Sequence, residues 1–129
     1  MSYYFSKTVD YKFDQAIDKI TEELKKEGFG ILTEIDLKET FKKKLDVDFR
    51  KYKILGACNP NMAYQAIQHE SRIGTMLPCN VIVQELENGK VEVSAVDPVA
   101  SMMSVKNDEL GEVAKDVRNK LKKIIENFQ

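Results

Sequence analysis

The stretch CNVIVQELENGKVEVSAVD, residues 79–97, decides the fold because it joins two β-prone runs through a turn signal. The runs Val81–Val83 and Val91–Val96 are rich in β-branched residues, which favour strands. Between them stands Asn88-Gly89, a dipeptide typical of the type I′ turn, in which both central residues take positive φ. The stretch therefore predicts a β-hairpin.

A two-residue loop at Asn88-Gly89 would set the register of this hairpin. It places Glu85 opposite Glu92, a like-charge pair that costs stability unless the carboxylates are solvated or share a cation. The other pairs that it predicts are Leu86 with Val91, Val83 with Ser94, Ile82 with Ala95, Val81 with Val96, and Asn80 with Asp97.

Outside the hairpin, alternating and helical periodicities define the remaining elements. Strands are predicted over residues 3–8, 29–35 and 52–58. Helices are predicted from residue 13 to Gly28, from Asp36 to Leu45, from Asn59-Pro60 to a point before Gly74, and from Asn107 to Phe128. The order β-α-β-α-β-α-β-β-α predicts an α+β fold, with helices covering one face of a largely antiparallel sheet.

Two finer expectations concern the loops and the third helix. Ala63, Ala66 and Ile67 are expected to face inward from the helix that follows Pro60. After Asp97-Pro98 we expect a loop, in which Met102 and Met103 fill a gap or a dimer seam.

Composition bounds the class of protein. The chain has 129 residues, of which 43% are apolar, so it is long enough for one hydrophobic core and a single domain over residues 1–129 is expected. Its formal net charge is −1, which gives no overall field toward nucleic acid or an anionic membrane. The first residues lack the pattern of a signal peptide, and no run is long and apolar enough to span a bilayer. We therefore expect a cytoplasmic protein.

Cys58 and Cys79 are the only cysteines. In a reducing compartment they are expected to stay free thiols, and the simplest interpretation is that both pack as small apolar residues. Cys58, however, precedes a helix N-terminus, which can lower a thiol pKa and so create a nucleophile. A thiol-dependent or redox activity centred on Cys58 is therefore an alternative, with Cys79 as the packing thiol.

Nucleophilic catalysis would also need a base. The single histidine, His69, lies on the predicted third helix, roughly 15 Å from Cys58 along an ideal helix axis. A direct pair within one chain is therefore not expected, and a pair across a dimer interface stays open. The acidic residues offer other bases, but their spacing singles out none.

Soft-metal binding through Cys58 and Cys79 is a third hypothesis, because thiolates suit Cu(I) and zinc. The sequence has no Cys-x-x-Cys pair, so its spacing does not indicate a prepared metal site. Neither a phosphate loop nor a dinucleotide fingerprint is present, and no cofactor is indicated.

A binding module is the remaining class. Polar side chains beside apolar strands are typical of a small-molecule pocket. The candidates are Asn59, Tyr64, Asn80 and Asp97, with Cys79 beside them. Asn59 and the free N–H groups after Pro60 would suit an anionic group, or Asn59 would only cap its helix.

Several segments together resemble the domain-of-unknown-function family 302, and the resemblance covers essentially the whole chain. They are Gly28-Phe29-Gly30, Ile35-Asp36, Leu55-Gly56-Ala57-Cys58-Asn59-Pro60, Ala63-Tyr64, Gly74, Leu77-Pro78-Cys79-Asn80-Val81 and Asp97-Pro98. The resemblance implies an α+β domain of the TATA-box-binding-protein-like topology class, a homodimer and no established enzymatic activity. That topology carries no implication of DNA binding, because fold does not determine function. We therefore expect a binding or structural homodimer, with a polar pocket near the two cysteine motifs.

Overall fold

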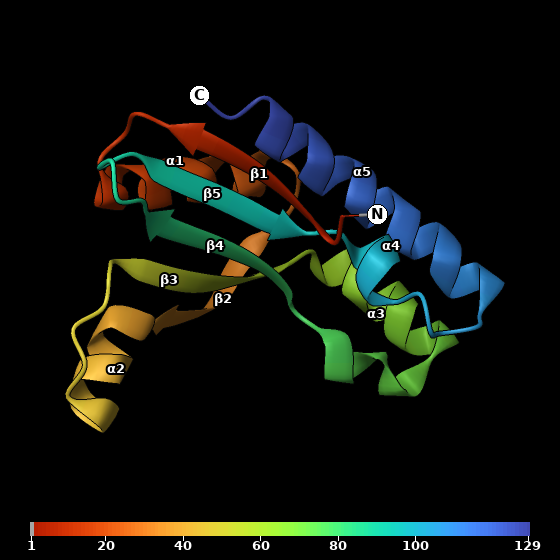
Figure 1. The fold of residues 1–129 in the computed structure, drawn as a ribbon. Coiled ribbons are helices and arrows are strands. Elements are labelled where there is room, and N and C mark those ends of the chain that lie inside the picture. Colours follow the sequence, from red (N-terminus) through yellow and green to blue (C-terminus); the bar gives the residue numbers. More distant parts are fainter. Residues whose placement is uncertain (1) are drawn as a thin grey trace.

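Five strands form one sheet in the computed structural model, which describes residues 2–129 (Figure 1). The strands are β1 (Tyr4–Val9), β2 (Gly30–Asp36), β3 (Tyr52–Cys58), β4 (Cys79–Glu85) and β5 (Val91–Val96). Their order across the sheet is β1-β5-β4-β3-β2, and every neighbouring pair is antiparallel. The predicted α+β class and element order are confirmed.

The helices are α1 (Phe13–Lys26), α2 (Leu37–Leu45), α3 (Pro60–His69), α4 (Pro98–Ser101) and α5 (Asp108–Glu126), with a 3₁₀ helix η1 at Ser71–Met76. Four of them, α1, α2, α3 and α5, begin where the sequence predicted. Asp36, Asn59 and Asn107 accept hydrogen bonds from the third N–H of their helices, as N-caps do. Gly28, with φ of 89°, ends α1 in the left-handed region that glycine adopts without strain.

The core lies between one face of the sheet and the two helices α1 and α5. Odd-numbered residues of β4 and β5 point to that face and are almost fully buried: Val81, Val83, Val91, Val93 and Ala95. They meet the apolar stripe of α1, which includes Ile20 and Leu24, and that of α5, which includes Leu121 and Ile125. In Figure 1, α1 lies behind the strands, and the opposite sheet surface, which we call the bare face, is turned to the viewer.

The predicted hairpin register is wrong by one residue. Val81 pairs with Ala95, Val83 with Val93, and Gln84 with Glu92, so Glu85 does not face Glu92. The loop has three residues, since the N–H of Leu86 donates to the carbonyl of Lys90 at 2.8 Å. Within it only Gly89 has positive φ, at 83°, which is the pattern of a type I turn followed by a glycine bulge.

Burial explains why this register wins. The predicted register would have turned the valines of β5 to the face opposite those of β4, because paired residues share a face. Burying each valine contributes about 1.5–3 kcal/mol. The three-residue loop also spares Asn88 the left-handed conformation, which costs a non-glycine residue about 1–2 kcal/mol. Burial and backbone sterics therefore both favour the observed register.

Two details near the cysteine end also differ from the sequence prediction. The expected loop after Asp97 contains α4, and its Asp97-Pro98 start repeats the cap and proline pattern of Asn59-Pro60. Ala66 is buried as predicted, but Ile67 is 43% exposed, because α5 covers only one side of α3.

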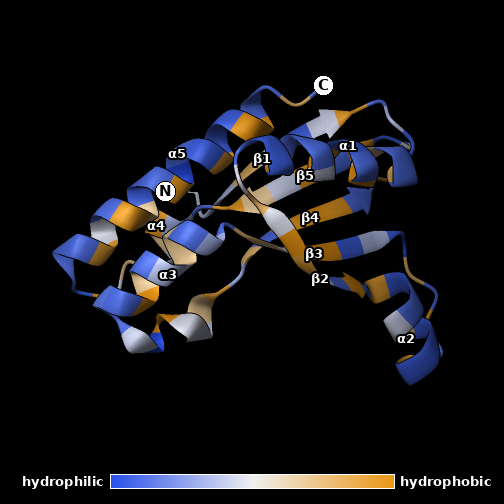
Figure 2. Ribbon diagram, turned by 180° about the vertical axis from the view of Figure 1, so that it is seen from behind, coloured by the Kyte–Doolittle hydropathy of each residue, from blue (hydrophilic) through white to orange (hydrophobic). Residues whose placement is uncertain are grey.

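The helix α2 stands apart from the core. None of its residues, 37–45, is buried, and Figure 2 shows it extending away from the sheet beyond β2 and β3. Leu32, Ile35, Leu45 and Val47, from the same continuous segment, are 46–67% exposed. We call this segment, residues 32–47, the apolar arm.

Candidate functional site

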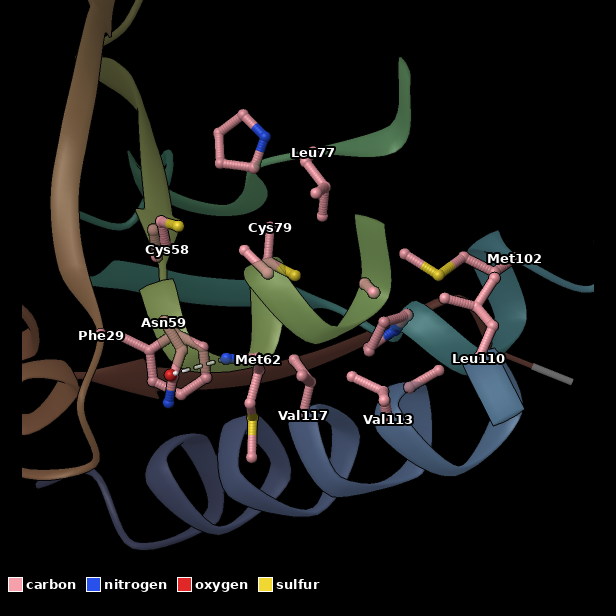
Figure 3. A pocket seen from close by; sticks show the side chains of 16 residues that line it. Phe29, Cys58, Asn59, Met62, Leu77, Cys79, Met102, Leu110, Val113 and Val117 are labelled. Carbon is pink, nitrogen blue, oxygen red and sulfur yellow. Dashed lines mark hydrogen bonds between the residues drawn. The ribbon is translucent and has the colours of Figure 1, made fainter. Parts of the chain in front are cut away.

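The two cysteines line one small cavity. Cys58 ends β3 and Cys79 begins β4, and the cavity lies between these strand ends and helices α3, α4 and α5 (Figure 3). Its volume is about 40 Å³, which leaves room for only a few water-sized groups. Its remaining walls are mainly apolar, and they include Phe29, Met62, Leu77, Met102, Leu110, Val113 and Val117. Met102 thus fills the gap that the sequence suggested, whereas Met103 is 68% exposed.

Burial sets the acidity of both thiols. Desolvation raises the pKa of Cys58 above its usual value. Burial, followed by the charge of the neighbouring Cys58, raises the pKa of Cys79 to about 11. Both raised pKa values mean that the thiols stay protonated at neutral pH.

Alkylation of the native protein by iodoacetamide is expected to be slow at both cysteines. Only the thiolate reacts, so a raised pKa means that Cys58 reacts more slowly than N-acetylcysteine at neutral pH, and that its rate climbs with pH. With a pKa of about 11, Cys79 holds roughly 100-fold less thiolate than a thiol of ordinary pKa. Mass spectrometry of the labelled peptides as a function of pH measures both rates.

The urea-unfolded chain is the control for this experiment, because there both thiols should react as free cysteine does. A native Cys58 that outpaces N-acetylcysteine at neutral pH would contradict the expectation and support the thiol-dependent alternative.

Asn59 has two structural partners. Its Oδ1 accepts from the N–H of Met62 at 3.3 Å, which caps α3. Its Nδ2 donates to the carbonyl of Glu27 at 3.3 Å, where α1 ends. The side chain therefore joins the end of α1 to the start of α3. These two hydrogen bonds explain the asparagine at this position without a ligand.

Tyr64 and His69 lie on α3 but away from the cavity. The Tyr64 side chain is 66% exposed and is not among the residues that line it. His69 Nδ1 lies 2.6 Å from Glu109 Oε2, and the Nδ2 of Asn107 donates to the His69 carbonyl at 3.0 Å. These contacts tie the end of α3 to the start of α5.

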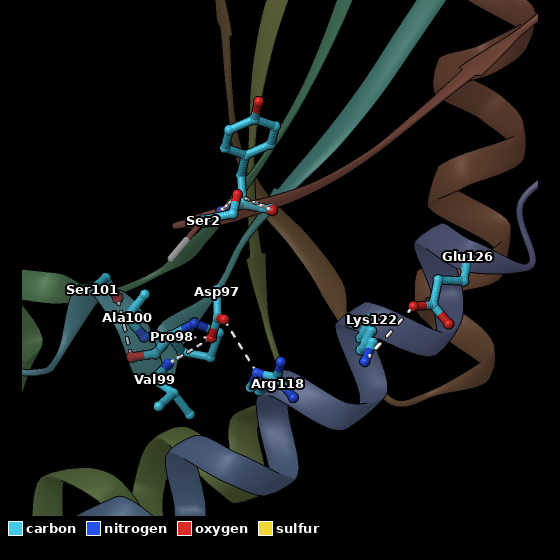
Figure 4. A network of polar contacts seen from close by, with 10 residues as sticks. Ser2, Asp97, Pro98, Val99, Ala100, Ser101, Arg118, Lys122 and Glu126 are labelled. Carbon is cyan, nitrogen blue, oxygen red and sulfur yellow. Dashed lines mark hydrogen bonds and ion pairs between the residues drawn. The ribbon is translucent and has the colours of Figure 1, made fainter.

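Asp97 does not face Asn80, contrary to the predicted register, because residue 96 takes that position. Its carboxylate is almost fully buried and works as the N-cap of α4 (Figure 4). Oδ1 accepts from the N–H of Val99 at 3.0 Å and of Ala100 at 3.4 Å, and Oδ2 accepts from Arg118 Nε at 3.1 Å. The Arg118 guanidinium also lies over the ring of Phe5.

Asn80 lies in a different place from the other candidates. It is exposed on the bare face of the sheet and lines an open hollow of about 430 Å³. The hollow is formed by Tyr3, Tyr4, Tyr52, Asn80, Ile82, Gln84, Glu92, Ser94, Ala95 and Val96. The structure therefore divides the predicted pocket in two: Cys58, Asn59 and Cys79 line the small apolar cavity, and Asn80 lines the larger polar hollow.

A chain of polar side chains crosses this hollow, and the sequence analysis missed it. Arg50 donates through Nε and Nη2 to Gln84 Oε1 at 3.0 and 2.8 Å, and Gln84 Nε2 donates to Glu92 Oε1 at 3.0 Å. Ser94 Oγ lies 3.5 Å from the same oxygen. The sequence carried one signal for these residues, since polar Glu92 and Ser94 alternate with valines along β5. Successive side chains of a strand point to opposite faces, so the alternation places Glu92 and Ser94 on the face opposite the core.

Comparisons with known proteins identify the family. The model of the domain of unknown function DUF302 matches residues 5–128. The chain belongs to the DUF302 family. A DUF302 crystal structure from Bacillus stearothermophilus, described as an uncharacterized conserved protein, matches with a TM-score of 0.91 and 26% identity over 100% of both chains. The comparison with curated proteins found no match.

Two further findings concern this DUF302 chain as a whole. Within residues 2–129, no three His, Cys, Asp or Glu side chains gather closely enough to hold a metal ion. None of the helices in that range combines the length and apolar character needed to cross a bilayer.

Proposed function

We propose that this DUF302 protein is a binding module, active as a homodimer, that takes a small molecule in the hollow on the bare face of its sheet. One observation carries the proposal. Arg50, Gln84 and Glu92 form an ordered chain of hydrogen bonds on a sheet surface that no helix of residues 2–129 covers, and three tyrosines line the hollow beside it. Convergent polar groups among aromatic rings are typical of ligand sites.

Size favours the hollow over the cavity beside the cysteines. Small-molecule sites usually measure about 300–1,000 Å³. The hollow, at about 430 Å³, falls within that range, and the cavity, at about 40 Å³, lies far below it. The hollow still adjoins the second cysteine motif, because Asn80 follows Cys79 directly and points into it.

The apolar arm, residues 32–47, is the surface that we propose for self-association. A nine-residue helix such as α2 is marginal in water unless its apolar side is covered, and here that side is only partly covered: Phe41 packs against Phe49, whereas Leu45 is exposed. The arm also includes most of the edge strand β2, whose outer backbone groups can pair with another strand. Its Lys42–Lys44 run and its Asp46 supply both signs of charge, which suits a two-fold interface.

An NMR titration tests the proposed ligand site. A library of neutral and charged aromatic fragments is added to the ¹⁵N-labelled protein, and amide shifts are followed. Hits are expected to move amides of β4 and β5, because these strands form the floor of the hollow. Fragments that bind only at α3 and α5, or no hits at all, would overturn the proposed site.

Two asparagine variants sharpen this test. Asn80→Trp places a large ring in the hollow and is expected to weaken every sheet-face hit at least tenfold, by steric exclusion. Asn88→Trp makes the same change at the exposed hairpin turn and should leave the hits unchanged. Equal effects of the two variants would count against the hollow.

A further inference from the structure

The carboxylate of Glu92 is only partly satisfied. Its side chain is half-buried, and both hydrogen bonds that it accepts, from Gln84 and Ser94, reach Oε1. Within residues 2–129 no basic side chain lies within ion-pairing distance, 4.0 Å, of it, and no hydrogen bond reaches Oε2. A half-desolvated carboxylate with one free oxygen favours a cationic partner that can donate a hydrogen bond.

The nearest candidate cation, Arg50, is engaged elsewhere. Two of its guanidinium nitrogens donate to Gln84 Oε1, and the group lies 4.5 Å from the ring centre of Phe49 and 5.5 Å from that of Tyr52. These contacts also fix the orientation of the Gln84 amide, because its oxygen must face Arg50 and its nitrogen must face Glu92. Gln84 therefore separates the two charges, and among the described residues Glu92 is the one charged side chain that lines the hollow.

The hollow changes character along its length. On β5, Glu92 and Val96 are four residues apart, which separates them by roughly 13 Å. Tyr4 pairs with Val96, and its ring packs at 5.0 Å against that of Tyr3 with an interplanar angle of 68°. Between Glu92 and Val96 the floor is formed by Ile82 and Ser94, which pair across β4 and β5. The hollow thus has an acidic end, a mixed middle and an end formed by Val96, Tyr3 and Tyr4.

We infer that the ligand is a small organic cation, an amine attached to an aromatic or apolar body. The ammonium group donates to Glu92 Oε2, and the body lies over Ile82 and Val96 toward the tyrosines. The tyrosine pair presents two nearly perpendicular rings, which suit an aromatic body by edge-to-face packing. This inference rests on the proposed function, because it assigns a ligand class to the same hollow.

Three matched probes test the charge. Phenethylamine carries an ammonium group, 2-phenylethanol replaces it by a neutral hydroxyl, and phenylacetate carries a carboxylate on a similar body. In ¹⁵N-detected titrations, phenethylamine is expected to bind the sheet face about tenfold or more tightly than 2-phenylethanol, because hydrogen bonds between charged groups are the stronger ones. Phenylacetate should bind more weakly than either.

Glu92→Gln removes the charge and keeps an acceptor for Gln84. It is expected to abolish the preference for phenethylamine over 2-phenylethanol. Glu87→Gln, at the exposed turn, removes the same charge away from the hollow and should preserve that preference. If Glu92→Gln does not fold, the relative affinities of the three probes for the unmodified protein still decide whether the hollow prefers a cation.

The outcomes separate the two proposals. Sheet-face binding of 2-phenylethanol or phenylacetate at least as tight as that of phenethylamine would overturn the cation inference and leave the ligand site standing. If no probe moves the amides of β4 and β5, while the fragment library also fails there, the proposed function falls and the cation inference with it.

Discussion

Asp97→Ala is expected to lower the free energy of unfolding by about 3 kcal/mol. The substitution removes the N-cap of α4, which is worth about 1 kcal/mol. It also breaks the ion pair with Arg118, and breaking a fully buried pair costs about 3–5 kcal/mol. Arg118 is 33% exposed, so water can solvate its guanidinium after the ion pair is broken. We therefore expect the loss of this ion pair to cost about half as much as the loss of a fully buried one. Urea unfolding followed by circular dichroism measures the change.

Two other aspartate variants separate the parts of this effect. Asp97→Asn keeps an oxygen for the cap and loses the charge, so it should show roughly half of the destabilisation. Asp18→Ala, on the exposed side of α1, should change stability by less than about 0.5 kcal/mol. An Asp97→Ala protein as stable as Asp18→Ala would contradict a structural role and return Asp97 to the ligand-binding candidates.

Leu45→Glu is expected to convert the proposed homodimer into a monomer. A charge at the centre of an apolar contact must be desolvated without a partner, which costs several kcal/mol, and in a two-fold interface the substitution occurs twice. Light scattering coupled to size exclusion should therefore show a fall from twice 14.8 kDa to 14.8 kDa. Because the Leu45 side chain lies outside the core, the circular dichroism spectrum of the variant should be unchanged.

Met103→Glu is the matched control, since Met103 is 68% exposed and Leu45 is 65% exposed. Met103 follows α4 by two residues, and Figure 1 shows α4 far from α2. The Met103→Glu variant is expected to remain dimeric. Dissociation of Met103→Glu but not of Leu45→Glu would move the interface to the methionine end, and a monomeric unmodified protein would remove the homodimer from the proposed function.

The fold was largely predictable, because its signals are local. Asp36, Asn59 and Asn107 each accept from an N–H three residues ahead, and Gly28 marks the end of α1 in the same local way. The Asp97-Pro98 start of α4 carried the same signal as Asn59-Pro60 and was missed. The strands were readable for a related reason, since alternation along a single strand separates its core face from its other face.

The hairpin register was predictable in principle and was predicted wrongly. Asn88-Gly89 pointed to a two-residue loop, and the glycine does take positive φ, but as the third residue of a longer loop. The positions of Val83 and Val93 were the stronger evidence. Residues that pair across a hairpin point to the same face, so these two valines both reach the core only when odd-numbered residues of β4 pair with odd-numbered residues of β5, as they do in the structure.

By itself the sequence determined the strands, the four longer helices and their order along the chain, because each rests on hydrogen bonds and side-chain periods within a few residues. Only the tertiary structure decided which of the candidate residues meet. Arg50 and Gln84 are 34 residues apart, and their contact exists because β3 pairs with β4 in one particular register. Tertiary structure likewise buried Asp97 against Arg118 and left one sheet face bare. Which surfaces α1 and α5 cover depends on the packing of the whole chain, and the hollow that we propose as a ligand site lies on the face that neither helix covers.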